Sequence, residues 1–148
     1  MPYVERSVLI NGPIEKVYEL AKDMERYHEY MPDVESVKII EREPNRTVTE
    51  WETSVDGTPI LWTEEDTFHD DEPRIEYRLI EGDLDKFEGE WRFVEKEHGT
   101  EVTLTCDYDF GIPELTNLIG PTLQQKVGEN SEMMLAGIKK RAEEALIS

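Results

Sequence analysis

The sequence has little cysteine, little positive charge and no long apolar run, and each shortage excludes a class of protein. A single cysteine, Cys106, rules out a framework of internal disulfides. No apolar stretch approaches the roughly 20 residues that a membrane-spanning helix needs. The segment Met1–Arg6 lacks the basic and apolar regions of a secretory signal. We therefore expect a cytoplasmic protein with no membrane insertion.

Positive charge is scarce, because 16 lysine and arginine residues face 35 aspartate and glutamate residues, which gives a formal net charge of −19. Nucleic acids and anionic membranes bind clustered cations, so neither is an expected partner. A basic protein partner stays open. The three histidines are far apart and only one cysteine is present, so no metal site is expected. No nucleotide-binding, zinc-protease or serine-hydrolase motif occurs, and no cofactor is predicted.

What is present is the composition of a folded domain. The 148 residues are 37% hydrophobic and include three tryptophans. A chain of this size builds a core without disulfides or a structural metal. No internal repeat and no linker divides it, so we expect one domain over residues 1–148.

The residue pattern predicts one strand, two short helices and then six more strands. The first strand covers residues 3–10, and Asn11-Gly12-Pro13 starts helices over about 14–23 and 24–30. From residue 34 onward apolar residues alternate with polar ones, and short turns interrupt the alternation. The strands expected from these breaks cover about 35–43, 46–55, 60–69, 74–80, 86–96 and 101–110. Their short connections make neighbouring strands antiparallel.

The C-terminal segment predicts a long helix over about 121–146 that covers one face of this sheet. Pro121 marks its expected start, and Gly137 near its inner side leaves room for the sheet or for a ligand. One apolar stripe follows the helical repeat and consists of Leu123, Val127, Met134, Ile138 and Ala145. The predicted fold class is therefore α+β, a seven-stranded antiparallel sheet with a long C-terminal helix over its concave face.

Several phrases of the sequence resemble one known superfamily. Residues 10–18, Ile-Asn-Gly-Pro-Ile-Glu-Lys-Val-Tyr, look like the opening of the START-like, polyketide cyclase/dehydrase and lipid-transport superfamily. Its aspartate, aromatic and proline landmarks are matched in residues 23–34, and residues 88–93 and the last helix follow in order. The resemblance covers essentially the whole chain and includes the coenzyme Q-binding-like branch. It implies the helix-grip fold and a cavity for an apolar small molecule between sheet and helix.

One predicted strand, 60–69, carries two acids among large apolar residues. Alternate residues of a strand share a face. The face with the larger apolar residues consists of Ile60, Trp62, Glu64, Asp66 and Phe68. This face is the expected inner one, so two carboxyl groups are predicted to point into the apolar interior.

Buried carboxyl groups are costly as ions unless they are paired, hydrated or protonated. One interpretation of Glu64 and Asp66 is a polar anchor for a ligand, with either acid also a candidate catalytic acid or base. The other interpretation is a structural one, either a salt bridge to Arg6 or Arg141 or a strand end open to solvent. Both interpretations stay open at this point.

Other inward residues complete the candidate site. Asn130 lies within the apolar stripe of the long helix and can hydrogen-bond a ligand carbonyl or a backbone group. The expected ligand-binding residues are Trp51, Trp62, Glu64, Asp66, Phe68, Tyr77, Trp91, Asn130 and Met134.

Three functions follow. The first is binding, transport or presentation of a lipid, quinone or polyketide-like compound, and the second is a cyclase or dehydratase that uses Glu64 or Asp66. The third is a protein-interaction module. The aromatase/cyclase branch has an arginine, a serine and a tyrosine where this chain has Asp66, Glu64 and Val34. That departure counts against a cyclisation that depends on those groups.

Overall fold

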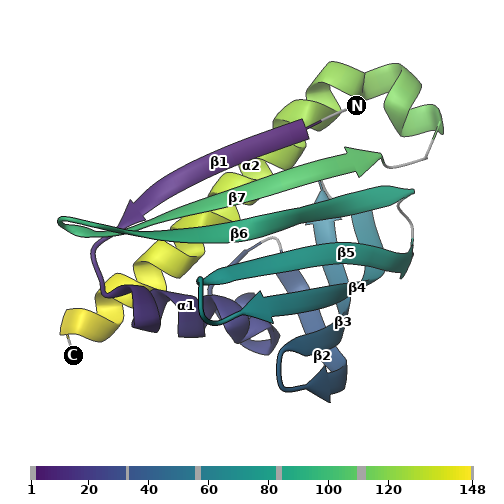
Figure 1. Cartoon of the computed structure of the whole chain (residues 1–148). Coiled ribbons are helices and arrows are strands. Elements are labelled where there is room, and N and C mark those ends of the chain that lie inside the picture. The colour runs from purple at the N-terminus through teal and green to yellow at the C-terminus, as the bar shows by residue number, and fades with distance from the viewer. Residues whose placement is uncertain (1–2, 33, 56–57, 83–84, 110–112, 148) are drawn as a thin grey trace.

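Seven strands form one antiparallel sheet, and a long helix crosses one face of it (Figure 1). The computed structural model describes residues 3–32, 34–55, 58–82, 85–109 and 113–147. The strands are β1 (Tyr3–Ile10), β2 (Val34–Glu43), β3 (Arg46–Val55), β4 (Thr58–His69), β5 (Arg74–Gly82), β6 (Lys86–Lys96) and β7 (Gly99–Asp109). The helices are α1 (Ile14–Lys22), the 3₁₀ helix η1 (Met24–Glu29) and α2 (Pro113–Ile147).

The sheet has the order β1-β7-β6-β5-β4-β3-β2. Hairpins connect β2 through β7 in order, and β7 also pairs with β1. The two short helices, α1 and η1, connect β1 at one edge of the sheet with β2 at the other edge. The α+β helix-grip fold expected from the sequence is confirmed. Within the described residues, no helix is both long and apolar enough to cross a membrane.

Helix α2 begins at Pro113, so the prediction of a start at Pro121 is wrong. A proline suits the first turn of a helix because its missing N–H has no partner within the helix there. In the sequence, either proline is compatible with the start of a helix, and no further residue pattern distinguishes Pro113 from Pro121. In the structure, Pro121 lies within α2.

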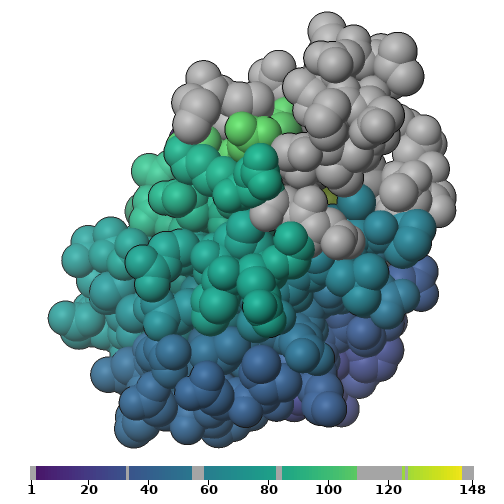
Figure 2. Space-filling model, turned by 90° about the vertical axis from the view of Figure 1, so that its right-hand side faces the viewer, coloured from purple at the N-terminus to yellow at the C-terminus, as the bar shows by residue number. Residues whose placement is uncertain are grey.

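The buried side of α2 is wider than the predicted stripe. Val127 and Ile138 are buried and Met134 is partly buried, while Leu135 and Ala142 are buried beside them. The remaining stripe positions, Leu123 and Ala145, have side chains outside the described part of the chain. Viewed from the side in Figure 2, the atoms of the strands, in blue and teal, form a continuous surface over the lower part of the molecule.

Two glycines of α2 lie against other parts of the chain. A β-carbon at Gly137 would lie 2.8 Å from the carbonyl oxygen of Tyr30 and 3.0 Å from Cγ of Met31. A β-carbon at Gly128 would lie 2.5 Å from Nη2 of Arg6. Gly137 therefore makes room for the segment after η1, not for the sheet or a ligand as the sequence suggested.

Alanine at these two glycines should have opposite effects on the free energy of unfolding. Both substitutions favour the helix by about 1 kcal/mol. Gly137→Ala should nevertheless destabilise the protein by about 1–3 kcal/mol, because the backbone at Tyr30 has to move. Gly128→Ala should be neutral or stabilising, because only the flexible end of Arg6 has to move. Urea denaturation measures both, and equal effects would contradict this packing.

Candidate functional site

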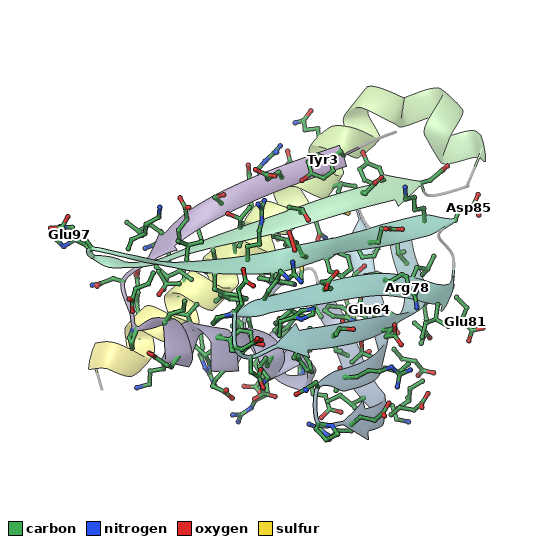
Figure 3. All side chains as sticks on the ribbon, in the orientation of Figure 1. Tyr3, Glu64, Arg78, Glu81, Asp85 and Glu97 are labelled. Carbon is green, nitrogen blue, oxygen red and sulfur yellow. The ribbon has the colours of Figure 1, made fainter. Side chains whose placement is uncertain are left out.

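Strand β4 places two acids in the interior by simple alternation. Trp62, Glu64, Asp66 and Phe68 are all buried, with Glu64 only 3% exposed and Asp66 fully buried, whereas Leu61 is half exposed. The pairing of β4 with β5 is irregular between Thr63 and Glu64, but both residues stay in sequence on β4 and the extra residue belongs to β5. Figure 3 shows Glu64 within the outline of the molecule, whereas Glu81 and Glu97 lie at its rim.

The two acids form a buried pair that accepts hydrogen bonds from neighbouring side chains. Their carboxyl groups lie next to each other, and among the described residues Oδ1 of Asp66 has no hydrogen-bond donor. Oε1 of Glu64 accepts a hydrogen bond of 2.8 Å from Nε1 of Trp62. Oδ2 of Asp66 accepts hydrogen bonds from Oγ1 of Thr49 at 2.7 Å and Oγ1 of Thr47 at 3.3 Å. Strand β3 supplies both threonines, because its register sets Thr49 opposite Glu64 and Thr47 opposite Asp66.

Burial raises the pKa of both carboxyl groups. Burial, followed by the charge of Asp66, raises the pKa of Glu64 well above its ordinary range. Burial also raises the pKa of Asp66, while its interaction with Glu64 and the hydrogen bonds from the two threonines oppose that rise. In the part of the chain that the structure describes, Oδ1 of Asp66 is buried without a donor, and a proton on Glu64 is the donor that would satisfy it. Glu64, whose pKa is raised further, is therefore the acid of the pair that holds a proton more readily.

The structural alternatives, a salt bridge to the acids or a strand end open to solvent, are both wrong, the second because both acids are buried. Arg6 pairs with Glu132 at 3.0 Å, and Arg141 pairs with Glu29 at 3.4 Å. Among the described residues, neither Glu64 nor Asp66 has a cationic partner. Within the described residues, the polar contacts of the pair are the hydrogen bonds from Trp62, Thr47 and Thr49.

A cavity of about 60 Å³ lies between the sheet and α2, and Glu64 is part of its wall. At about 30 Å³ for each water, this space holds roughly two water molecules. Seven of the predicted site residues line it: Trp51, Trp62, Glu64, Tyr77, Trp91, Asn130 and Met134.

Two predicted residues do not line the cavity. Asp66 lies behind Glu64, where it accepts a hydrogen bond from Thr49. Phe68 lies beyond Asp66 on β4, and its ring is 5.3 Å from Nζ of Lys22. The acid that reaches the cavity is therefore Glu64, and Asp66 acts on the cavity through it.

The prediction missed seven lining residues: Thr53, Ile60, Phe87, Leu104, Cys106, Val127 and Ser131. Alternation already placed Phe87, Leu104 and Cys106 on the inner face, but it does not distinguish a residue packed against α2 from one beside free space. Ser131 carried a usable signal, since it lies one helical turn beyond Val127 on the same side of α2.

Aromatic rings form most of the wall near Glu64. The rings of Trp51 and Trp62 stack with centroids 5.5 Å apart, and Phe87 lies 5.0 Å from Trp62 and 5.3 Å from Tyr77. All three tryptophans of the chain line the cavity. The faces of such rings carry partial negative charge.

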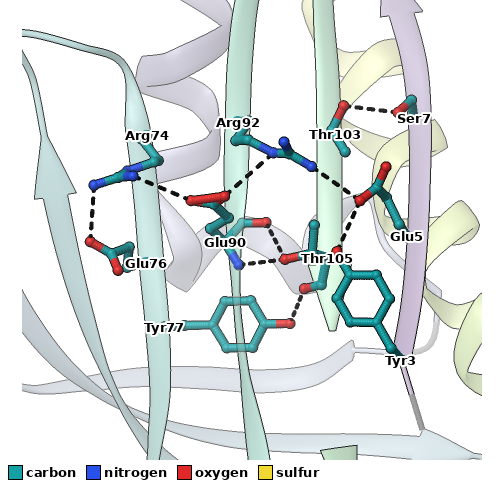
Figure 4. A network of polar contacts seen from close by, with 10 residues as sticks. All are labelled: Tyr3, Glu5, Ser7, Arg74, Glu76, Tyr77, Glu90, Arg92, Thr103 and Thr105. Carbon is teal, nitrogen blue, oxygen red and sulfur yellow. Dashed lines mark hydrogen bonds and ion pairs between the residues drawn. The ribbon is translucent and has the colours of Figure 1, made fainter. Parts of the chain in front are cut away.

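A hydrogen bond fixes Tyr77 in the cavity wall at a point where the pairing of two strands is broken (Figure 4). The regular pairing of β6 with β7 stops around Gly89 and Glu90, and the hydroxyl of Tyr77 donates a hydrogen bond of 2.5 Å to the carbonyl oxygen of Thr105. The N–H of Glu90 donates to Oγ1 of Thr105 at 2.9 Å. A β-carbon at Gly89 would lie 2.1 Å from the carbonyl oxygen of Thr105, so this crossing requires glycine.

Ion pairs on the outer face of the sheet fix the same strands. Arg92 of β6 contacts Glu5 of β1 at 3.1 Å and Glu90 at 3.4 Å, and Arg74 of β5 contacts Glu90 at 3.6 Å (Figure 4). These pairs are exposed or partly exposed, so each contributes little stability alone. Together they link β1, β5 and β6, of which β5 and β6 contribute Tyr77, Phe87 and Trp91 to the cavity wall.

The profile of the polyketide cyclase/dehydrase and lipid transport family matches residues 10–135. The chain belongs to this family. The crystal structure of TTHA0849 from Thermus thermophilus is 36% identical, with a TM-score of 0.93 over 97% of this chain and 99% of that chain.

Two further proteins show the range of similarity. The Zhui aromatase/cyclase from Streptomyces sp. R1128 is 24% identical with a TM-score of 0.89 over 97% of this chain and 94% of that chain, a likeness of fold. The ribosome association toxin RatA of Escherichia coli is 22% identical over 111 residues, which cover 74% of this chain and 70% of that protein.

Glu64→Gln should make the protein progressively more stable than the wild type as the pH rises. Because the folded-state pKa of Glu64 is raised, the wild type is most stable below the usual glutamate value of about 4.3 and loses stability as the pH rises toward the folded-state pKa. Glutamine keeps the bond from Trp62, donates to Asp66 and does not ionise. The gain should be about 1.4 kcal/mol for each unit of the pKa shift.

Urea denaturation at several pH values measures this gain, with Glu65→Gln as the matched control. Glu65 neighbours Glu64 on β4, but a hydrogen bond from Arg46 lowers its pKa. A lowered pKa adds stability above the usual value, so this control should lose stability at neutral pH and match the wild type in acid. Parallel pH curves for the wild type and Glu64→Gln would contradict the raised pKa of Glu64.

Proposed function

We propose that the protein binds a compact apolar molecule in the cavity between the sheet and α2. The supporting observation is the wall itself, in which aromatic and aliphatic side chains surround a single acid that is almost fully buried. Ligand sites in proteins have this composition, with apolar walls that supply affinity and a few polar groups that fix orientation. Binding is also the activity implied by the lipid transport part of the family description.

The cavity supports a smaller ligand than a lipid or a long-chain quinone. Its volume of about 60 Å³ is less than half of the roughly 150 Å³ of a cavity that binds benzene, so even a single ring requires side chains of the wall to move. Asn130 and Ser131 on α2 face Glu64 and Thr53 on the sheet across it, so polar groups are available on both walls. A longer ligand requires that α2 move away from the sheet.

A second candidate is catalysis of a dehydration or cyclisation. The observation that favours it is the raised pKa of Glu64, because a neutral acid in an apolar wall is a competent proton donor. The relatives of this protein include a putative polyketide cyclase of Streptomyces cyaneus, which is 25% identical over 146 residues. Native mass spectrometry separates the two candidates. If the protein is a dehydratase, the molecule bound to Glu64→Gln should be heavier by one water than the molecule bound to the wild type. If it is a binding protein, the two bound molecules should have the same mass.

Benzyl alcohol, a neutral probe with a single ring, should bind and change the tryptophan emission, because all three tryptophans line the cavity. Ser131→Leu should weaken this binding by at least about tenfold, because the larger side chain fills the cavity. The control is Ala136→Leu, a similar increase in side-chain volume at an exposed position five residues further along α2, which should leave binding unchanged. Circular dichroism establishes that both variants are folded.

Unchanged binding of benzyl alcohol in a folded Ser131→Leu variant would show that the molecule binds elsewhere. The absence of saturable binding in the wild type would contradict the proposed function itself.

A further inference from the structure

Glu64, the acid in the cavity wall, has no protein cation beside it in the part of the chain that the structure describes. Arg6 and Arg141, which the sequence suggested as its partners, pair with other acids. A buried charge without a partner is strongly unfavourable. Within the described residues, the other polar groups that line the cavity are neutral, among them Thr53, Asn130 and Ser131.

Aromatic faces surround the same acid. Trp62 donates to Glu64 through Nε1, and its ring stacks on Trp51 and contacts Phe87. A cation is attracted both to a carboxylate and to the faces of tryptophan rings, and the attraction to the rings is strongest where water is excluded. The wall therefore combines the two features that bind an organic cation, next to space for an apolar body.

Transfer of a proton from Glu64 to Asp66 allows Glu64 to present a carboxylate without any exchange with solvent. The O–H bond of Glu64 breaks and an O–H bond forms on Asp66, which then donates a hydrogen bond back to Glu64. The hydroxyls of Thr47 and Thr49 continue to donate to Oδ2 of Asp66. The net charge of the pair is the same before and after the transfer.

We propose that the ligand is a compact apolar amine, whose ammonium group pairs with Glu64 while its hydrocarbon part fills the aromatic cavity. This inference rests on the proposed function, since it names the chemical class of the bound molecule. The formal net charge of −19 also favours the approach of cations over anions.

Three probes of the same shape test the inference: benzylamine, benzyl alcohol and benzoate. Wild-type protein should bind benzylamine at least about tenfold more tightly than benzyl alcohol, because the ammonium group forms a charge-assisted hydrogen bond with Glu64. Benzoate should bind most weakly of the three. Isothermal titration calorimetry at pH 7, together with tryptophan emission, measures the three dissociation constants.

Two isosteric variants should separate the roles of the acids. Glu64→Gln should abolish the preference for benzylamine, because the cavity wall then carries no ionisable oxygen. Asp66→Asn should keep the preference, because Glu64 becomes the carboxylate and accepts from the new amide. Glu65→Gln, on the outer face of the same strand, should behave like the wild type toward all three probes.

Equal affinities for benzylamine and benzyl alcohol in the wild type would overturn the inference and leave the proposed function intact. Failure of both probes to bind would overturn both. Retention of the benzylamine preference in Glu64→Gln, with its loss in Glu65→Gln, would place the cation on the outer surface and would also overturn the inference.

Discussion

Alternate side chains of a strand point to opposite faces, so β4 cannot bury Trp62 and Phe68 without also burying Glu64 and Asp66. Two ions in that position would repel each other in a medium that solvates neither. Burial raises the pKa of both acids, which disfavours this state, and neighbouring side chains stabilise the pair by hydrogen bonding. Trp62 donates to Glu64, and two threonines of β3 donate to Asp66.

The position of α2 determines which of the two acids lies beside the cavity. The helix packs closely against the chain at Gly137, where the carbonyl of Tyr30 occupies the space of a side chain. Earlier in α2, Val127, Asn130 and Met134 lie opposite the sheet and line the cavity instead. Close packing at one part of the helix and free space at another leave Glu64 beside a cavity, while Asp66 stays behind it.

Much of this arrangement was predictable because it depends on local patterns. Alternation identified the strands and placed Glu64, Trp62 and Tyr77 on the inner face. The hydrogen bonds to Asp66 were not predictable, because they depend on the register that sets Thr47 and Thr49 of β3 against β4. The exclusion of Asp66 and Phe68 from the cavity was not predictable either, because it depends on where α2 crosses the sheet.

The ionisation state of the pair is the central claim, and a carbon NMR titration of the side-chain carboxyl groups tests it most directly. The account predicts that at pH 7 one proton remains on the pair, and that the carboxyl carbons of Glu64 and Asp66 change together above the usual range of acids. Two carboxyl groups that are both fully ionised at pH 7, each with an ordinary pKa, would contradict it.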